Sequence, residues 1–212
     1  MKLIAFDLDG TLVDSARDLA ACINMTRATY DLPPLPVEQV AGYLGCGIRD
    51  LLRKSLSDLE NPDLDNALKK QTAFYTDHLT DTTCLYPGAL ETLQELRRRG
   101  AKIALVTNKD SWAAVKILQA LQVAELFDDI IGGNSGYPFK PEPDALTALQ
   151  KKYGVDAADC WMVGDHHTDL GAGRRAGFKR IFCTFGFGIC GDETPDFTVD
   201  SFPEILPLIG EI

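Results

Sequence analysis

Short apolar runs alternate with helical patterns along most of this 212-residue chain, and no other feature constrains its fold as strongly. The runs have the length of buried strands and cover residues 2–6, 102–107, 129–132, 160–164 and 179–184. The helical patterns cover residues 87–100, 111–121, 143–153 and 170–176. Strands that alternate with helices predict a parallel sheet covered on both faces, with any active site at the carboxyl ends of the strands. We therefore expect an α/β fold with a Rossmann-like core.

The interval 15–82 interrupts this alternation because it holds no convincing strand. Helical patterns cover 16–30, 48–59 and 62–79, and Ser15 followed by Asp18 resembles a capping box at the start of the first helix. A segment of this length without a strand favours an inserted helical module over helices that simply pack onto the sheet. We predict an α/β core formed by 1–14 and 83–212, and an all-helical cap, 15–82, that covers the site.

Two aspartates follow the first strand. The run Lys2-Leu3-Ile4-Ala5-Phe6 stops at Asp7-Leu8-Asp9-Gly10-Thr11. Residues i and i+2 of an extended chain point to the same side, so Asp7 and Asp9 can share one site. Two close carboxylates repel each other unless a cation or a proton separates them. The placement suggests a divalent metal with a nucleophile and acid pair, although Asp-rich turns also follow strands that have no such role.

Polar residues follow two later segments as well. Val106-Thr107-Asn108-Lys109 ends a strand, and a threonine hydroxyl beside backbone N–H groups suits phosphate oxygens, although Thr-Asn is also a common start of a helix. Lys140 lies beside Pro141 and Pro143. The fixed backbone of proline would hold this ammonium in place, where it could neutralise negative charge.

A second acidic cluster, Val163-Gly164-Asp165-His166-His167-Thr168-Asp169, follows a strand and opens a helix. Asp165 and Asp169 are one helical turn apart. Such hard oxygen ligands suit Mg²⁺, while a charge that complements the helix dipole would also explain Asp169. His166 and His167 are interpreted as polar loop residues, because oxygen-rich sites favour Mg²⁺ over metals that prefer imidazole.

Taken in order, these motifs resemble those of the haloacid dehalogenase superfamily of phosphotransferases, and the resemblance covers the whole chain. The segment from Phe6 to Ser15 resembles the first motif, and the other three fall at Thr107, at Lys140 and at Asp165 with Asp169. The family more often has a small hydroxyl residue at the position of His166. The stretches 45–52, 184–188 and 195–202 also resemble the phosphoglycolate-phosphatase-like subgroup, and we interpret the latter two as structural.

This resemblance implies Mg²⁺-dependent hydrolysis of a small phosphomonoester, as in 2-phosphoglycolate phosphatases. Asp7 would attack phosphorus and form an aspartyl-phosphate, while Asp9 would protonate the leaving oxygen and then activate water. The implied metal ligands are Asp7, the Asp9 backbone carbonyl and Asp165, with Asp169 orienting a water on the metal. The implied substrate contacts are Lys140, Thr107, Asn108, Gly10 and Thr11, with Arg49 in the cap as a candidate partner for a carboxylate.

Other functions share this pattern. A phosphomutase or a pyrophosphatase of the same fold would have the same core motifs. A non-catalytic phosphate-binding regulator is conceivable, but it would have no use for both Asp7 and Asp9. A phospho-acceptor of the response-regulator kind needs neither a cap nor Asp9.

The net charge of −10 argues against nucleic acid and against an anionic membrane surface as partners. No apolar run approaches the ~20 residues of a membrane span, and no signal-type segment opens the chain. The six cysteines lack Cys-x-x-Cys spacing, which predicts reduced thiols rather than a zinc site. We expect a cytoplasmic protein, a monomer or a weak dimer, whose partner is a small phosphorylated molecule.

Overall fold

The computed structural model describes residues 1–211 and contains a six-stranded sheet with the order β5-β4-β1-β6-β7-β8. All neighbouring pairs in this sheet are parallel, which confirms the predicted fold class. Its strands are β1 (Leu3–Phe6), β4 (Lys102–Val106), β5 (Asp129–Ile131), β6 (Cys160–Gly164), β7 (Lys179–Cys183) and β8 (Phe197–Val199).

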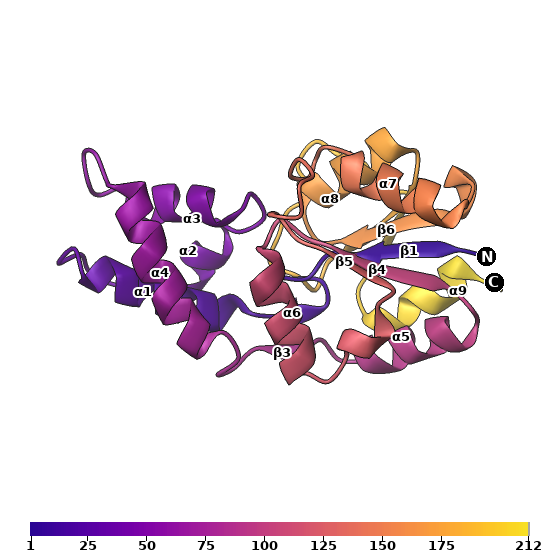
Figure 1. Ribbon diagram of the computed structural model, residues 1–212, viewed down its shortest axis with the longest axis horizontal. Helices are drawn as coiled ribbons and strands as arrows, with labels where there is room; N and C mark the ends of the chain where they lie inside the picture. Colours follow the sequence, from indigo (N-terminus) through magenta and orange to yellow (C-terminus); the bar gives the residue numbers. More distant parts are fainter. Residues whose placement is uncertain (212) are drawn as a thin grey trace.

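Helices cover both faces of this sheet because successive side chains of each strand point to opposite faces. Ile4 and Phe6 belong to one apolar cluster, whereas Leu3 and Ala5 belong to another. Figure 1 shows α7 and α8 on one face and α5, α6 and α9 on the other. The covering helices are α5 (Ala89–Arg98), α6 (Ser111–Ala120), α7 (Asp144–Tyr153), α8 (His167–Ala176) and α9 (Ile205–Ile209), with single 3₁₀ turns η1 (Ala124–Leu126), η2 (Ala157–Asp159) and η3 (Phe202–Glu204).

Four further helices lie between β2 (Val13–Asp14) and β3 (Cys84–Leu85) and gather beside the carboxyl end of the sheet (Figure 1). They are α1 (Ala16–Ala28), α2 (Val37–Ala41), α3 (Ile48–Ser55) and α4 (Leu64–His78). They share an apolar cluster of their own, which includes Ile23, Leu52 and Ala67. We call this group of helices the cap helices. The short helix α2 and the antiparallel pairing of β2 with β3 were not predicted.

The capping box predicted for Ser15 and Asp18 is wrong. Ser15 precedes α1, but its side chain makes no capping hydrogen bond and donates to the Asp9 carboxylate instead. The Asp18 carboxylate accepts hydrogen bonds from the backbone and hydroxyl groups of Thr82 and Thr83. Both side chains thus have partners outside the first turn of α1, and those partners replace the local cap.

The order of the strands brings three strand ends together. The chain starts at β1, extends the sheet through β4 and β5, and then returns to the other side of β1 with β6. Neighbouring strands whose connections leave in opposite directions form a crevice at their carboxyl ends, where ligands bind in open α/β sheets. The residues that follow β1, β4 and β6 therefore face one another. Within residues 1–211, no helix combines the length and the apolar character that crossing a membrane requires.

Candidate active site

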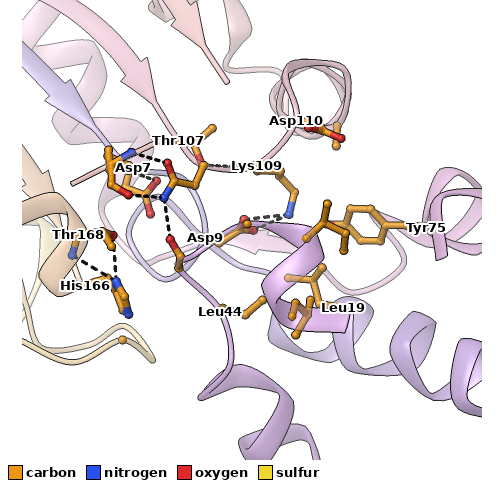
Figure 2. A pocket seen from close by; sticks show the side chains of 18 of the residues that line it. Asp7, Asp9, Leu19, Leu44, Tyr75, Thr107, Lys109, Asp110, His166 and Thr168 are labelled. Atoms are coloured by element: carbon orange, nitrogen blue, oxygen red, sulfur yellow. Dashed lines mark hydrogen bonds and ion pairs between the residues drawn. The ribbon is translucent and has the colours of Figure 1, made fainter. Parts of the chain in front are cut away.

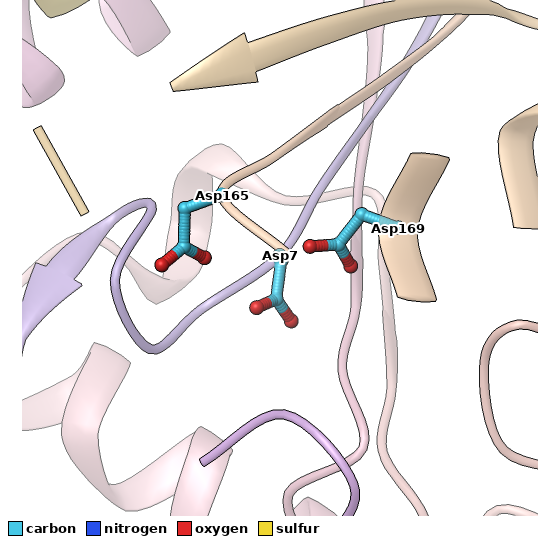
Figure 3. Close-up of side chains that lie close together, drawn as sticks. All are labelled: Asp7, Asp165 and Asp169. Atoms are coloured by element: carbon cyan, nitrogen blue, oxygen red, sulfur yellow. The ribbon is translucent and has the colours of Figure 1, made fainter. Parts of the chain in front are cut away.

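Three carboxyl groups meet at the ends of β1 and β6. Oxygens of Asp7, Asp165 and Asp169 lie within 4.8 Å of one another, and Figure 3 shows the three side chains converging. Asp7 is 8 % exposed, Asp165 2 % and Asp169 0 %. Such a buried cluster of acids needs a compensating cation, because burial disfavours the charged form and like charges disfavour it further.

Asp165 and Asp169 are held by the surrounding chain. Asp165 accepts hydrogen bonds from the Thr11 hydroxyl (3.1 Å) and from the backbone N–H groups of Phe187 (3.1 Å) and Gly188 (2.8 Å). Asp169 accepts from the backbone N–H of His166 at 3.0 Å, which completes a capping box at the start of α8. These contacts fix both carboxylates before any ligand arrives.

The acid cluster has the electrostatic character of a cation site. Burial, together with the charges of Asp169 and Asp7, raises the pKa of Asp165 to about 8. Burial also raises the pKa of Asp7 to about 6, against the opposing effect of Lys140. A bound divalent cation would stabilise the ionised forms of both groups. Three convergent carboxylates are hard oxygen ligands, so the donor set fits the metal that the sequence predicts.

Lys140 supplies the positive charge beside this cluster. Its Nζ donates to Asp7 Oδ1 (2.7 Å), to Asp169 Oδ1 (2.6 Å) and to the Val106 carbonyl (2.6 Å). The side chain is only 4 % exposed. Burial lowers the pKa of this ammonium, but the charges of Asp169 and Asp7 outweigh burial and raise it above its usual range. Lys140 therefore stays charged and fixes the rotation of the Asp7 carboxylate.

Thr107 and Asn108 lie at the end of β4, next to this lysine. The Asn108 side chain accepts from the Lys140 backbone N–H (2.8 Å) and donates to the carbonyls of Lys140 (3.0 Å) and Gly45 (2.8 Å). The Thr107 hydroxyl accepts from the Lys109 N–H at 3.2 Å. Asn108 thus joins β4 to the Lys140 segment and to the cap helices' loop at Gly45.

Asp9 faces away from the acid cluster toward a second lysine. Its carboxylate accepts from Lys109 Nζ at 2.8 and 3.0 Å and from the Ser15 hydroxyl. Figure 2 shows Lys109 between Asp9 and Tyr75 of α4, with Nζ 4.8 Å from the centre of the tyrosine ring. The lysine side chain is 9 % exposed. Sequence reasoning gave Lys109 no role, although it directly follows the Thr107-Asn108 pair.

Gly10 and Thr11 form the turn that follows Asp7 and Asp9, and this turn packs against Asp165. Gly10 has φ +82°, and a Cβ placed on it would lie 2.0 Å from Asp165 Oδ2, so only glycine fits. Its N–H donates to the Val13 carbonyl at 2.9 Å. Thr11 is fully buried and directs its hydroxyl to Asp165. Both residues thus position Asp165 in this structure.

Arg49 lies on the outer surface of the cap helices. Its guanidinium pairs with Asp65 at 2.6 Å, and the two side chains are 61 % and 75 % exposed. It is not among the residues that line the cavity described next. The structure therefore does not bring Arg49 together with the other predicted site residues.

A cavity of about 80 Å³ lies between the strand ends and the cap helices. Asp7, Asp9, Lys109 and Lys140 line its core side, and Gln71 and Tyr75 line its cap side. Apolar side chains also line the cavity, namely Leu19, Leu44, Ile48, Leu51, Trp112, Ala113 and Phe187. Sequence reasoning missed Gln71 and Tyr75 because helical spacing alone does not distinguish a residue that faces a cavity from one in a packed core.

His166 closes the cavity beside Asp165. It is half-buried, and its Nδ1 lies 2.9 Å from the Thr168 hydroxyl. Burial and the neighbouring His167 lower the pKa of His166 to about 4, so the ring is neutral near pH 7. A Cβ placed on Gly45 would lie 2.7 Å from this ring. The histidine is therefore a contact between core and cap rather than only a polar loop residue.

Comparisons with known proteins show which family this chain belongs to. A sequence model described as haloacid dehalogenase-like hydrolase matches residues 1–177. The chain is 36 % identical to the phosphoglycolate phosphatase of Aliivibrio fischeri, over 99 % of this chain and 97 % of that protein. It is 33 % identical to phosphoglycolate phosphatase 1 of Pseudomonas aeruginosa, over 97 % and 79 %. The crystal structure of a predicted phosphoglycolate phosphatase from Haemophilus somnus superposes with a TM-score of 0.94 at 31 % identity, over 99 % and 98 % of the two chains.

Proposed function

Because this chain belongs to the haloacid dehalogenase-like hydrolase family, we propose that it hydrolyses small phosphomonoesters through a covalent aspartyl-phosphate, with 2-phosphoglycolate as the first candidate substrate. The observation that carries this proposal is the buried cluster of Asp7, Asp165 and Asp169 around Lys140. The substrate candidate comes from the phosphoglycolate phosphatases that the chain resembles along nearly its full length.

In the proposed reaction, Asp7 is the nucleophile. One carboxylate oxygen forms a bond to phosphorus as the bond from phosphorus to the leaving oxygen breaks, which gives an acyl phosphate on Asp7. Lys140 holds Asp7 Oδ1, and its charge also attracts the phosphoryl oxygens. Thr107 and Asn108 are proposed to contact the same oxygens from the end of β4. Gly10 and Thr11 complete the turn beside them.

Asp9 is proposed as the acid and base. It gives a proton to the leaving alcohol in the first step, and in the second it accepts a proton from the water that attacks the acyl phosphate. This second attack releases inorganic phosphate and restores Asp7. Since Asp9 pairs with Lys109 and Ser15 in the free protein, it must turn from them toward the leaving oxygen in each cycle.

Mg²⁺ is the proposed cofactor. Asp7, the backbone carbonyl of Asp9 and Asp165 would hold the ion, with Asp169 next to them. When bound, Mg²⁺ cancels the repulsion between the carboxylate nucleophile and the phosphoryl group. The chain itself supplies the pre-oriented carboxylates, because Thr11 and two backbone N–H groups already fix Asp165.

Residues 15–82 are proposed to act as a cap that limits the size of the substrate. The cavity of about 80 Å³ favours a small leaving alcohol. Its walls also shield the acyl phosphate from bulk water while the alcohol departs. Arg49 stays a prediction, since it would have to leave Asp65 to reach this cavity.

A phosphate-release assay tests the function. The purified protein is incubated with Mg²⁺ and a panel that includes 2-phosphoglycolate, ethyl phosphate, p-nitrophenyl phosphate and pyrophosphate. We expect turnover of phosphomonoesters without an added bisphosphate, and loss of turnover with excess chelator. Pyrophosphate as the preferred substrate, or a requirement for a bisphosphate, would instead indicate a pyrophosphatase or a mutase. Absence of turnover on the whole panel would contradict the proposal.

A further inference from the structure

The cap side of the cavity presents polar side chains that the proposed reaction does not use, and two of them, Gln71 and Tyr75, are buried. Gln71 and Tyr75 lie four residues apart on α4, so they occupy the same face of the helix. Both line the cavity. Gln71 is 1 % exposed and Tyr75 is 6 % exposed, so neither side chain is solvated from outside.

Each of these side chains carries a polar atom without a hydrogen-bond partner in the described part of the chain, namely Gln71 Nε2 and Tyr75 Oη. The orientation of the Gln71 amide is fixed, because its Oε1 accepts a hydrogen bond from the Thr26 hydroxyl at 2.7 Å. This bond leaves Nε2 as the unsatisfied end. Buried polar atoms are nearly always satisfied in proteins. Four other side chains between residues 1 and 211 have such an atom, but none of them lines the cavity.

Lys109 adds a positive charge at the same place. Its Nζ lies 4.8 Å from the centre of the Tyr75 ring, and Figure 2 shows Lys109 directed toward Tyr75. The carboxylate it contacts is Asp9, which the proposed acid–base step turns toward the leaving oxygen. That step would free the ammonium at the moment when the substrate is bound. Two donors and one cation at the end of a cavity with apolar walls form an arrangement suited to an anionic oxygen group.

We propose that Gln71, Tyr75 and Lys109 form the subsite for the organic half of the substrate, and that this subsite takes a carboxylate. The inference rests on the proposed phosphatase function and deepens it. Phosphorus lies at Asp7, and the leaving alcohol extends past Asp9 toward α4, where its carboxylate accepts hydrogen bonds from Gln71 Nε2 and Tyr75 Oη beside Lys109. The assignment differs from that of Arg49, which lies outside the cavity.

The test compares two substrates of similar size, 2-phosphoglycolate and ethyl phosphate, which lacks the carboxylate. Gln71→Leu and Tyr75→Phe each remove one donor. We expect each variant to lower kcat/KM for 2-phosphoglycolate by about 10-fold or more. The change in kcat/KM for ethyl phosphate should be less than about 3-fold, because ethyl phosphate has no carboxylate to contact the removed donor. Gln71→Glu keeps the acceptor for Thr26 but places a negative charge at the subsite. Gln71→Glu should therefore lower kcat/KM for 2-phosphoglycolate, relative to ethyl phosphate, by more than Gln71→Leu does.

A thermal-unfolding measurement separates this role from a structural one. The Tyr75 hydroxyl has no partner in the free protein, so Tyr75→Phe should leave Tm unchanged or raise it while it lowers kcat/KM. The control is Gln94→Leu, the same chemical change at an exposed glutamine of α5, which should not alter the ratio of the two kcat/KM values. Arg49→Ala is measured in parallel as the competing assignment.

The outcomes distinguish the subsite from the function. Equal losses on both substrates, no loss on either, or a selective loss at Arg49 alone would overturn the subsite. Turnover of ethyl phosphate but not of 2-phosphoglycolate by the wild type would do the same. If the wild type hydrolyses neither substrate, the proposed function fails, and Tm still tests the subsite. In that case, 2-phosphoglycolate must raise Tm more than ethyl phosphate does, and this difference must disappear in Gln71→Leu.

Discussion

At the scale of single residues, the three buried acids differ in how well the protein itself stabilises them. Asp165 accepts three hydrogen bonds and Asp169 accepts two. Among residues 1–211, the Asp7 carboxylate accepts one, from Lys140. A carboxylate with few hydrogen bonds keeps lone pairs available for attack, whereas its two neighbours are already engaged. This asymmetry supports the proposed roles, in which Asp7 is the nucleophile and Asp165 and Asp169 are supporting residues.

We expect Asp7→Asn to reduce turnover to below about 1 % because an amide oxygen cannot form the covalent phosphoryl bond. The fold should persist, because the substitution is isosteric. It also removes a carboxyl group whose pKa is raised to about 6 by burial. Phosphate release and thermal unfolding measure the two effects. Asp192→Asn, at an exposed aspartate, is the control for the same chemical change. A variant of Asp7 that retains more than a few per cent of turnover would rule out the covalent step.

The acid cluster also predicts a pH-dependent response to Mg²⁺. The pKa values of Asp7 and Asp165 are raised to about 6 and about 8. At any pH between the ordinary carboxyl pKa and these raised values, the folded state therefore holds protons that the unfolded state releases. The contribution of these two carboxyl groups to the stability of the metal-free protein should therefore fall as pH rises from about 4 to about 8, and His166, whose pKa is lowered to about 4, offsets part of this fall up to its ordinary pKa. Bound Mg²⁺ removes this penalty, so the rise in Tm on adding Mg²⁺ should be larger at pH 8 than at pH 5.

Scanning calorimetry with Mg²⁺ or with chelator measures this response. At a 100-fold excess over Kd, binding contributes about 2.7 kcal/mol, which corresponds to a Tm rise of about 5–10 °C for a chain of this size. Asp165→Asn should remove most of the rise and flatten the pH dependence of the metal-free protein. A rise that is equal at both pH values, or that survives Asp165→Asn, would show that Mg²⁺ does not bind at this cluster.

At the scale of elements, the two chain segments that lead into and out of the cap helices are joined twice. The strands β2 and β3 pair with each other, and Asp18 in α1 accepts hydrogen bonds from Thr82 and Thr83 just before β3. Burial raises the pKa of Asp18, but these hydrogen bonds together outweigh burial and lower it below its usual range. The connection between cap and core is thus held by an ionised carboxylate.

Asp18→Asn should destabilise the protein by about 1.5–3 kcal/mol at pH 7, the usual contribution of hydrogen bonds to a charged group. Because the folded-state pKa is lowered, this contribution is present above the ordinary carboxyl pKa and is lost as pH falls through the lowered value. The difference between wild type and variant should therefore shrink below about pH 4. Urea unfolding across this range measures it, with Asp77→Asn on the exposed face of α4 as the control. A difference that is constant with pH would contradict the role of the charge.

The sequence predicts the helices and strands better than it predicts which side chains contact one another. The alternation of apolar runs and helical patterns is enough to anticipate β1, β4 and β6 and the helical insertion, because periodicity reports which faces are buried. The partners of Ser15 and Asp18 were mispredicted since a local motif cannot reveal competing groups such as Thr82, which is 64 residues away from Asp18. Lys109 was missed for the same reason, because its contact with Asp9 exists only once β4 lies beside β1.

At the scale of the whole molecule, the cap helices meet the core through a glycine. The loop before α3 lays Gly45 between two core side chains, so that the Gly45 carbonyl accepts from Asn108 and its Cα packs against the His166 ring. Gly45 has φ +106°, and a Cβ there would lie 2.7 Å from that ring. The contact between this loop and the core therefore depends on the absence of a side chain at this position.

Gly45→Ala should hold the loop away from His166, break the Asn108 contact and keep the cavity open. We expect kcat/KM to fall by about 10-fold or more, as for the loss of a positioning contact near the reacting groups. The loss should be similar for 2-phosphoglycolate and ethyl phosphate, because the proposed cap would enclose both substrates in the same way. Gly42→Ala is the matched control, since Gly42 has an ordinary backbone conformation and a Cβ there meets its neighbours at 3.5 Å. It should change kcat/KM by less than about 2-fold, in line with other surface substitutions.

The decisive measurement combines this substitution with the loss of the ring it would strike. His166→Ser removes the imidazole, so the double variant Gly45→Ala, His166→Ser should recover much of the activity that Gly45→Ala loses relative to His166→Ser alone. Two residues in steric contact give a coupling energy in such a cycle, whereas independent sites give additive effects within about 0.5 kcal/mol. Additivity would mean that Gly45→Ala acts through its positive φ alone. A recovery would instead show that the His166 ring is the surface against which the Gly45 loop packs.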